Sequence, residues 1–554
     1  MFEAWDRKMA SLQPSRLAQR LAGLLRQPQR PPTIAEYNRG PFWKNHRIIA
    51  GLLYAALLIV YGVAIGMTGR FYLLQLAVPL IVLAALVIWA LPDAKNPPTN
   101  WIVFLLFAFI VALLSWPDYL AFAIPGLPWI TAIRLVAFPL ALVMLICLSV
   151  SRSFRAEMLT VLNATPLTWK MLVGFTVIAA LSIAVSSNIS LSVNKFIVAQ
   201  LYWTLIFFGS AWVFIRSGRA TLLAYLIWGF AIYVCAIGIL EWRMQALPWA
   251  GRIPSFLVVE DPAVQNILAA KARAATGIYR VQSKFTTPLG LAEFLGLMTP
   301  IVLYFLIFAR HLAVKLAALA SLPLILYTIL LTDSRLGFVG FSMSFLLFLL
   351  AWAIMRWMRV KGSIFGPAVT LGYPAVFLGF IASTFLVGRI RALVWGTGAH
   401  SFSTEAREDQ VANGIPMILS QPWGYGIGRG AEQLGYTNLE GTLTIDSYYL
   451  LIGLEFGVIG FLLYFGMFVA QICYAMAMFP KIRTMEQLLL IPLMIALTNF
   501  VIIKSIFAQQ ENHPLIFAIL GAMTALVLRV RNEQDTPSPQ DHVVFERDQK
   551  TITA

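Results

Sequence analysis

The sequence predicts an all-α, multi-pass (polytopic) membrane protein, and three observations lead to this fold class. Hydrophobic residues make up 59% of the 554 residues and charged residues only 12%, whereas soluble domains carry about 25% charged residues. Apolar stretches of roughly 20 residues recur along the chain, which is the length that a helix needs to cross a bilayer. Basic residues concentrate in every second connection between these stretches, as in membrane proteins with a fixed orientation.

The first 45 residues form a separate, polar and basic N-terminal segment on the cytoplasmic side. This composition is unlike that of a cleavable signal peptide. Leu17, Leu21 and Leu24 share one helical face flanked by arginines, which predicts a short amphipathic helix on an anionic membrane surface. A disordered tail explains the composition equally well.

We predict about fourteen spans, with a range of about twelve to fourteen, in a transmembrane domain of residues 46–530. Their approximate ranges are 46–68, 71–91, 101–116, 130–150, 169–187, 198–215, 220–241, 287–309, 315–332, 337–355, 366–388, 447–475, 486–503 and 514–530. The third span is short, and the segment from Trp116 to Trp129 after it is predicted to be re-entrant or interfacial. Residues 531–554 are polar and predicted to be a disordered cytoplasmic tail.

The basic residues define an orientation in which both termini are cytoplasmic. The inside connections then contain Lys95, Arg152, Arg155, Arg216, Arg219, Arg310, Lys315, Arg356, Arg359, Lys361, Lys481, Arg483, Arg529 and Arg531. The short outside connections are nearly free of basic residues. This distribution accounts for the net charge of +16 without nucleic acid as a partner, because the chain has no basic soluble domain to bind it.

Two outside loops, 242–286 and 389–446, oppose the charge rule. The basic residues of the first loop are Arg243, Arg252, Lys271, Arg273, Arg280 and Lys284. Either an anionic partner lies on this face, or loops of this length escape the rule. Within the first loop, Asp261 followed by Pro262 predicts the start of a short helix, with Asp261 as its N-cap.

Arg335 lies in the segment 332–337 (TDSRLG), where the ninth span meets the tenth on the outer face. A guanidinium at the membrane edge offers a planar fork to phosphate oxygens. A snorkelling side chain or a local pair with Asp333 would place an arginine there as well. Gly337 and Gly340, which follow, allow close approach of another helix.

Arg280 enters the eighth span, and Glu293 lies inside that span. A carboxylate within the membrane indicates either function or an ion pair with an arginine of another span.

The lone histidines His400 and His513 are predicted to be incidental. No cluster of cysteine, histidine or carboxylate residues at ligand spacing is present, so neither a metal nor another cofactor is predicted.

The second outside loop contains a predicted helix that starts near Thr404 and carries Arg407 in its first turns. The segment 422–428 (PWGYGIG) follows, and its alternating glycines let the backbone bend sharply near a ligand. Its spacing differs from the GxGxxG of dinucleotide-binding folds.

Asp446 stands where the twelfth span begins. It is either the N-cap of that helix or a general base at the mouth of a cavity. Glu455 lies nine residues further, about 13 Å deeper along a straight helix. That depth favours a structural ion pair for Glu455 rather than direct chemistry.

The order of these motifs resembles the O-antigen ligase and polysaccharide polymerase superfamily of bacterial inner membranes. That superfamily has a Ser-Arg-Gly-like motif at the start of a late span and then a large periplasmic loop. The loop carries an arginine-bearing helix, a Pro-x-x-Gly-x-Gly-like turn and a His-Asn-x-Tyr-Leu motif, and Glu-x-Gly-x-x-Gly enters the next span. The counterparts here are 334–337, Arg407, 422–428, 446–450 and 455–460, so the large loop lies between the eleventh and twelfth spans.

The resemblance implies metal-independent glycosyl transfer on the periplasmic face, from a glycan on undecaprenyl pyrophosphate. Arg335 and Arg407, together with Arg280, would bind the pyrophosphate and stabilise the charge of the leaving group. Asp446 would be the catalytic base for an acceptor hydroxyl. The implied partners are the donor, a glycan acceptor, membrane lipids and assembly proteins such as a chain-length regulator.

Asp446 occupies the place of the histidine of the ligases, and aspartate is found there in polymerase-like members. We therefore interpret the chain as a polymerase of O-antigen or exopolysaccharide repeat units. A ligase that transfers finished glycan to lipid A core or to protein is the first alternative. A flippase or another transporter of lipid-linked glycan is the second.

Overall fold

The computed structural model describes residues 83–88, 91–94, 96–123, 129–257, 261–269, 277–359, 362, 364–386, 388, 391, 401–437 and 443–532. The chain divides into two units, residues 1–85 and 86–554, and the description below concerns the second. The predicted N-terminal segment, the first span, most of the second span and the tail after Asn532 lie outside the described residues.

Eleven helices in the described part of the chain are long and apolar enough to cross a membrane, which confirms the all-α polytopic fold class. These spans are Ala132–Val150, Pro166–Val185, Ile189–Val213, Arg219–Met244, Pro288–Phe308, Leu312–Leu331, Arg335–Met358, Phe365–Leu386, Tyr448–Lys481, Gln487–Lys504 and His513–Asn532. A twelfth apolar helix, α7 (Thr99–Ser115), corresponds to the predicted short third span.

The spans are built from helices whose bounds lie within a few residues of the predicted ones, except that the sixth span begins nine residues earlier than predicted, at Ile189. They are α8 (Ala132–Val150), α10 (Pro166–Ser182), α11 (Ile189–Ala199), α12 (Leu205–Val213), α13 (Arg219–Met244), α15 (Pro288–Phe308), α16 (Leu312–Leu331), α17 (Arg335–Arg359), α18 (Phe365–Leu386), α22 (Tyr448–Met478), α23 (Leu490–Lys504) and α24 (His513–Asn532). The connections contain α9 (Arg152–Leu162), α14 (Pro262–Ala269), α20 (Ser401–Ser420) and α21 (Gly430–Leu434).

The core of the bundle is formed by α15, α23 and α24, which are the most buried spans, whereas α18 is the least buried span. Such exposure is expected of an apolar helix that faces lipid. Small residues bring the core helices together, because a Cβ on Gly296 of α15 would lie 3.3 Å from the Cα of Gly340 on α17. The predicted role of Gly340 in close helix packing is therefore confirmed.

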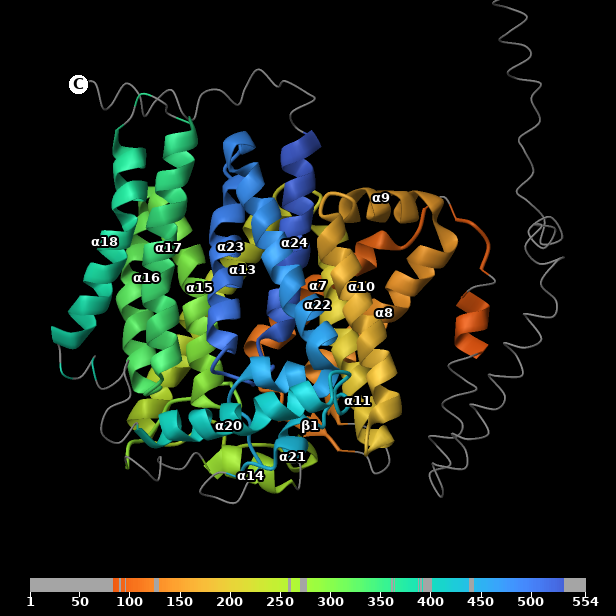
Figure 1. Ribbon diagram of the computed structural model, residues 1–554. Helices are drawn as coiled ribbons and strands as arrows, with labels where there is room; N and C mark the ends of the chain where they lie inside the picture. The colour runs from red at the N-terminus through yellow and green to blue at the C-terminus, as the bar shows by residue number, and fades with distance from the viewer. Residues whose placement is uncertain are drawn as a thin grey trace, which may run out of the picture. The chain divides into compact units, whose positions relative to one another are not determined.

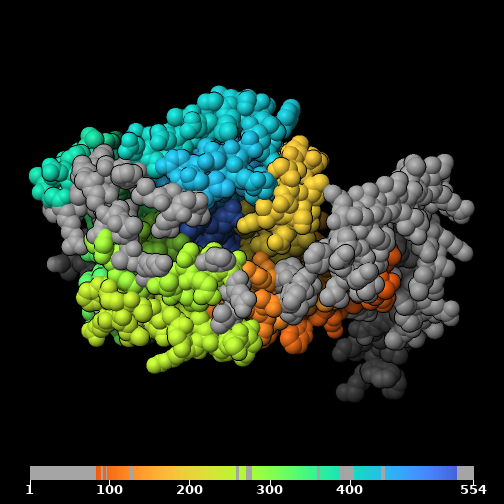
Figure 2. Space-filling model, turned by 90° about the horizontal axis from the view of Figure 1, so that it is seen from below, coloured from red at the N-terminus to blue at the C-terminus, as the bar shows by residue number. Residues whose placement is uncertain are grey.

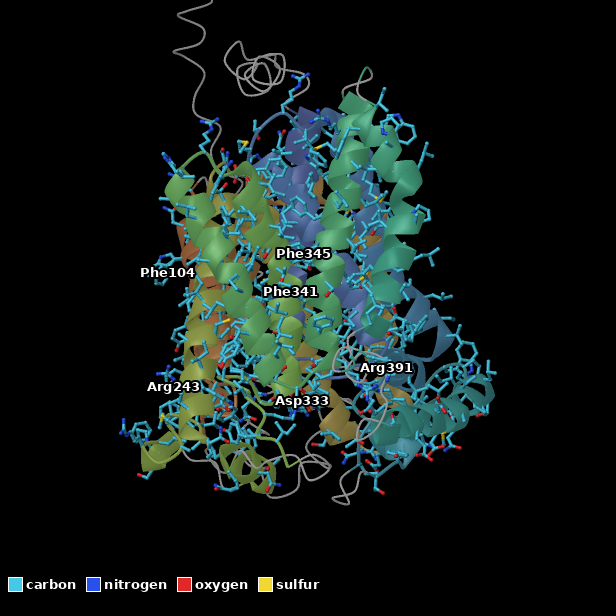
Figure 3. All side chains as sticks on the ribbon, turned by 90° about the vertical axis from the view of Figure 1, so that its left-hand side faces the viewer. Phe104, Arg243, Asp333, Phe341, Phe345 and Arg391 are labelled. Atoms are coloured by element: carbon cyan, nitrogen blue, oxygen red, sulfur yellow. The ribbon has the colours of Figure 1, made fainter. Side chains whose placement is uncertain are left out.

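Helices α14, α20 and α21, which belong to the two predicted outside loops, lie at one end of the bundle, and α9 lies at the opposite end (Figure 1). We call the first end the site end. Arg243, Asp333 and Arg391 lie at the site end as well (Figure 3). Helix α14 begins at Pro262, and the side chain of Asp261 accepts a hydrogen bond of 2.7 Å from the N–H of Ala263, so this predicted capped helix is confirmed.

One connection differs from the prediction, and the re-entrant or interfacial character of the segment after α7 stays a prediction. Residues 189–199, expected to lie mainly in a short outside loop between the fifth and sixth spans, form α11 and continue through a π-helical segment, Gln200–Thr204, into α12. The segment after α7 contains a small antiparallel ribbon of β1 (Ala121–Phe122) and β2 (Ile130–Thr131). Its short strands satisfy backbone groups where the chain turns back between spans.

Candidate functional site

A cavity of about 630 Å³ opens at the site end, a volume typical of sites for small molecules. Residues from five parts of the chain line it: 195–203, 280–289, 333–339, 407–455 and 506–510. Seen from the site end, cyan, green and yellow segments surround a hollow with blue residues at its bottom (Figure 2). The cavity thus lies where segments distant in sequence meet.

All four residues that the sequence predicts for the site line this one cavity: Arg280, Arg335, Arg407 and Asp446. The structure therefore brings the predicted constellation together. The roles of these residues in binding and catalysis stay predictions.

The turn between α16 and α17 connects to Arg280 and leads directly into Arg335. Asp333 adopts a left-handed conformation (φ +48°), which ends α16 sharply and lets α17 begin at Arg335. The Nε–H of Arg280 donates a hydrogen bond of 2.8 Å to the carbonyl oxygen of Thr332. This bond ties the entry of α15 to the turn, so both guanidinium groups reach the same cavity wall.

Arg407 and Asp446 face each other across the junction of α20 and α22. The Nε of Arg407 lies 3.5 Å from Oδ2 of Asp446, and this Nε–H has no hydrogen-bond partner among the described residues. The backbone N–H of Asp446 donates to Oε1 of Gln410 at 2.8 Å. Helix α20 therefore holds Asp446 through its backbone and leaves the carboxylate in a loose ion pair.

Asp446 is not the N-cap of the helix that follows it. The cap of α22 is Ser447, whose side chain accepts a hydrogen bond from the N–H of Leu450. This outcome removes the capping interpretation of Asp446. Burial raises the pKa of Asp446, and the positive charge of Arg407 opposes part of that rise.

Helix α22 is interrupted at Gly457, which the sequence did not predict. Gly457 has φ +67° and ψ −171°, and a Cβ there would overlap the carbonyl oxygen of Pro422. Only glycine suits this backbone and this contact. The N–H of Val458 donates instead to Pro422 at 3.2 Å, so the segment 422–428 replaces helical hydrogen bonds at the break.

This segment, which we call the glycine loop (residues 422–428), packs against α22 beside Glu455. Tyr425 and Gly426 donate through their backbone N–H groups to the carbonyl oxygens of Leu454 and Glu455 at 2.7 and 3.1 Å. The buried carboxylate of Glu455 accepts hydrogen bonds from the N–H groups of Gly428 and Gly430. The predicted structural ion pair is thus replaced by amide donors, and Glu455 lines the same cavity as Asp446.

Sequence reasoning missed Lys195 of α11, which also lines the cavity. Its predicted place was an outside connection with almost no charge. A lysine there opposes the charge rule in the same way as the basic residues of the long loops, and this signal would have found it.

Glu293 does not reach the cavity but lies behind it in a buried ion pair. Its carboxylate is 2.8 Å from Nζ of Lys504, and both side chains are fully buried. The expected pair with another span is therefore present, with a lysine in place of an arginine. Lys504 also donates to the carbonyl oxygen of Gln509, so this pair supports the wall formed by residues 506–510.

Of the two histidines that the sequence analysis considered, the structure describes His513. His513 is buried at the start of α24 and stacks on Trp203, with 5.7 Å between ring centroids; it does not line the cavity. His400 lies outside the described residues. Within the described ranges, no three histidine, cysteine or carboxylate side chains group as a metal site, and the prediction of metal-independent chemistry stays a prediction.

The fold and the cavity define a multi-pass membrane protein with a charged site at one end of its bundle. Residues 320–465 match the family model described as O-antigen ligase. The match confirms the resemblance to the O-antigen ligase and polymerase superfamily, whose members are glycosyltransferase-like enzymes. Arg335, Arg407 and Asp446 lie inside the matched region, whereas Arg280 lies outside it. The curated proteins compared with the chain gave no match.

Proposed function

We propose that the protein is an inner-membrane polysaccharide polymerase that joins oligosaccharide repeat units carried on undecaprenyl pyrophosphate. The reaction would occur at the periplasmic face, with the site end outside and both termini in the cytoplasm. The observation that carries the proposal is the single cavity that gathers Arg280, Arg335, Arg407 and Asp446, three of them within the matched domain.

In the proposed reaction, a hydroxyl of the acceptor glycan attacks the anomeric carbon of the donor. The bond from that carbon to the phosphate oxygen breaks, and undecaprenyl pyrophosphate leaves. The carboxylate of Asp446 takes the hydroxyl proton. The three arginines stabilise the negative charge that develops on the departing pyrophosphate, and the reaction draws on no metal or other cofactor.

The loose ion pair of Arg407 supports this assignment. Its Nε–H lacks a hydrogen-bond partner in the described part of the chain, and a buried donor without a partner is costly. A phosphate oxygen in the cavity would satisfy it. The hydroxyl of Ser334 is buried in the cavity lining and has no hydrogen-bond partner among the residues that the structure describes, so it is a second donor of this kind.

The second candidate function is a ligase that transfers finished glycan to lipid A core or to protein. It is favoured by the description of the matched family as O-antigen ligase. The polymerase is preferred because residue 446 is an aspartate where the ligases have histidine. Both activities use the same donor and leaving group.

Purified protein in detergent with a lipid-linked repeat unit distinguishes these functions. A polymerase gives a ladder of longer lipid-linked glycans and releases undecaprenyl pyrophosphate. A ligase gives a single transfer to added lipid A core. If no pyrophosphate carrier is released under either condition, both enzyme functions are wrong and a transporter of lipid-linked glycan becomes the better hypothesis. Addition of a chain-length regulator, a proposed partner, would change the ladder without being needed for release.

A further inference from the structure

We propose that Lys195 is a further binding residue of the site and contacts the diphosphate of the lipid-linked glycan. This inference rests on the proposed function, because it assigns a fourth cationic contact to the same substrate. Lys195 lies outside the region that matches the O-antigen ligase family. It lies on α11, and the glycine loop that packs against it belongs to the matched region.

The geometry of α11 directs Lys195 into the cavity. Lys195, Ala199 and Trp203 all line it, and their spacing of four residues places them on one face of a continuous helix. The π-helical segment Gln200–Thr204 lies within this stretch. Such segments often occur at functional sites, because they change which side chains a helix presents.

The ammonium group of Lys195 is accessible to a ligand. The side chain is exposed, and among the described residues it has neither a hydrogen bond nor an ion pair within 4 Å. Glu455 is its charged neighbour, but that carboxylate already accepts hydrogen bonds from the amides of Gly428 and Gly430. The ammonium group of Lys195 can therefore still bind an anionic ligand.

The glycine loop fixes the position of Lys195. A Cβ on Gly428 would lie 3.0 Å from Cγ of Lys195, so the lysine stem runs along the loop backbone. Ile427 joins the loop to α10 and α11: its carbonyl oxygen accepts from Oγ of Ser192 at 2.6 Å, and its N–H donates to Oγ of Ser182 at 3.2 Å. The loop and α11 thus form one wall, on which Lys195 supplies the cation.

The chemistry of this wall favours phosphate over a neutral sugar hydroxyl. A lysine acts as a compact point charge with three donors, whereas an arginine offers a planar fork. A diphosphate has oxygens on two phosphorus atoms and can contact cations on two walls at once. Arg335 of α17 and Lys195 of α11 come from different walls of the cavity. An acidic sugar would also attract Lys195, so the test uses a ligand without sugar.

The experiment measures equilibrium binding of farnesyl diphosphate and farnesyl monophosphate to the purified full chain. Lys195→Met keeps the length of the stem and removes the charge, and we expect it to weaken binding of the diphosphate about tenfold or more. We expect Lys195→Arg to bind within about threefold of the wild type, since it keeps a cation. Lys170→Met is the matched control, because Lys170 is exposed on α10 and does not line the cavity.

The outcomes separate this inference from the proposed function. If Arg335→Ala loses diphosphate binding and Lys195→Met binds like the wild type, the assignment of Lys195 is overturned while the proposed function stands. If the wild type binds neither ligand, the proposed donor is wrong and the inference fails with it. If Lys195→Met weakens only the binding of an acidic glycan and leaves the binding of farnesyl diphosphate unaffected, the lysine contacts the sugar. The diphosphate assignment is then overturned.

Discussion

Two ion pairs lie close to the cavity, and they differ in their burial and in the distance between their charged groups. We call the more buried one the closed pair and the other the open pair. Glu293 and Lys504 are fully buried and 2.8 Å apart, with Asn512 donating a further hydrogen bond to Glu293 at 2.9 Å. Arg407 and Asp446 are 3.5 Å apart, with side chains 26% and 36% exposed. The first pair is fully buried and does not line the cavity. The second has an unused donor and opens on the cavity, so it can exchange a partner for a substrate.

This comparison teaches that charged pairs near the cavity serve two purposes here. The closed pair supports a wall, because Lys504 also holds the segment that leads to α24. The open pair is part of the site. Changes to the first are expected to act on stability, and changes to the second on activity.

Lys504→Ala is expected to destabilise the protein by about 3–5 kcal/mol, because it leaves the carboxylate of Glu293 buried without its cation. Thermal unfolding of the purified protein in detergent measures the loss. The double variant Glu293→Gln with Lys504→Met removes both charges and should be much closer to the wild type. An unfolding temperature of Lys504→Ala equal to that of the wild type would show that the closed pair is not a stabilising element.

Arg335→Ala and Arg407→Ala are each expected to lower the rate of glycan transfer about 100- to 1000-fold, because each removes a group that stabilises the leaving pyrophosphate. Product release from a lipid-linked repeat unit measures the rate, and the amount of protein in the membrane should not change. Arg243→Ala is the matched control. Arg243 is exposed at the same end of the bundle as Asp333 (Figure 3) but does not line the cavity. Full activity of both site variants would exclude the open pair from catalysis.

The fold class could be predicted from the sequence, and so could the location of four site residues at one end of the molecule. That prediction was feasible because apolar length and basic connections fix which ends of spans lie together. Arg280 and Arg335 both stand at ends of spans that topology places on one face. Their meeting in one cavity follows from that placement and from the turn at Asp333.

The positions of Lys195 and Glu455 in the cavity lining could not be predicted in this way. Glu455 precedes the interruption of α22 at Gly457, so it lies at about the depth that a straight helix gives. The cavity nevertheless extends to it, and the glycine loop fills the break that follows. The exchange of hydrogen bonds between residues 422–428 and 454–458 is a tertiary event. No local pattern in either segment specifies its partner, just as none specifies that Ser192 binds Ile427.

Asp446→Asn is expected to lower the transfer rate about 100-fold, because asparagine keeps the shape of the side chain but cannot accept the proton. In the wild type the base must be ionised, and burial raises the pKa of Asp446 above its ordinary value. Activity should therefore be present above this raised pKa and be lost as the pH falls through it. The pH profile of kcat/KM measures this acid limb, and the residual activity of Asp446→Asn should lack it. An identical acid limb in the variant would assign the base to another group.

Ser447→Ala has the smallest expected effect and separates the helix cap from the chemistry. Ser447 caps α22 through Leu450, and loss of such a cap costs about 1 kcal/mol. Unfolding in detergent should show this loss, while the transfer rate under stabilising conditions stays within about threefold of the wild type, because the carboxylate of Asp446 and its backbone bond to Gln410 are retained. Asp446→Asn should show the opposite pattern, with nearly unchanged stability and lost activity. If Ser447→Ala instead abolished transfer at full stability, the hydroxyl of Ser447 would take part in the reaction. Ser447 would then be a residue of the site as well as the cap of α22.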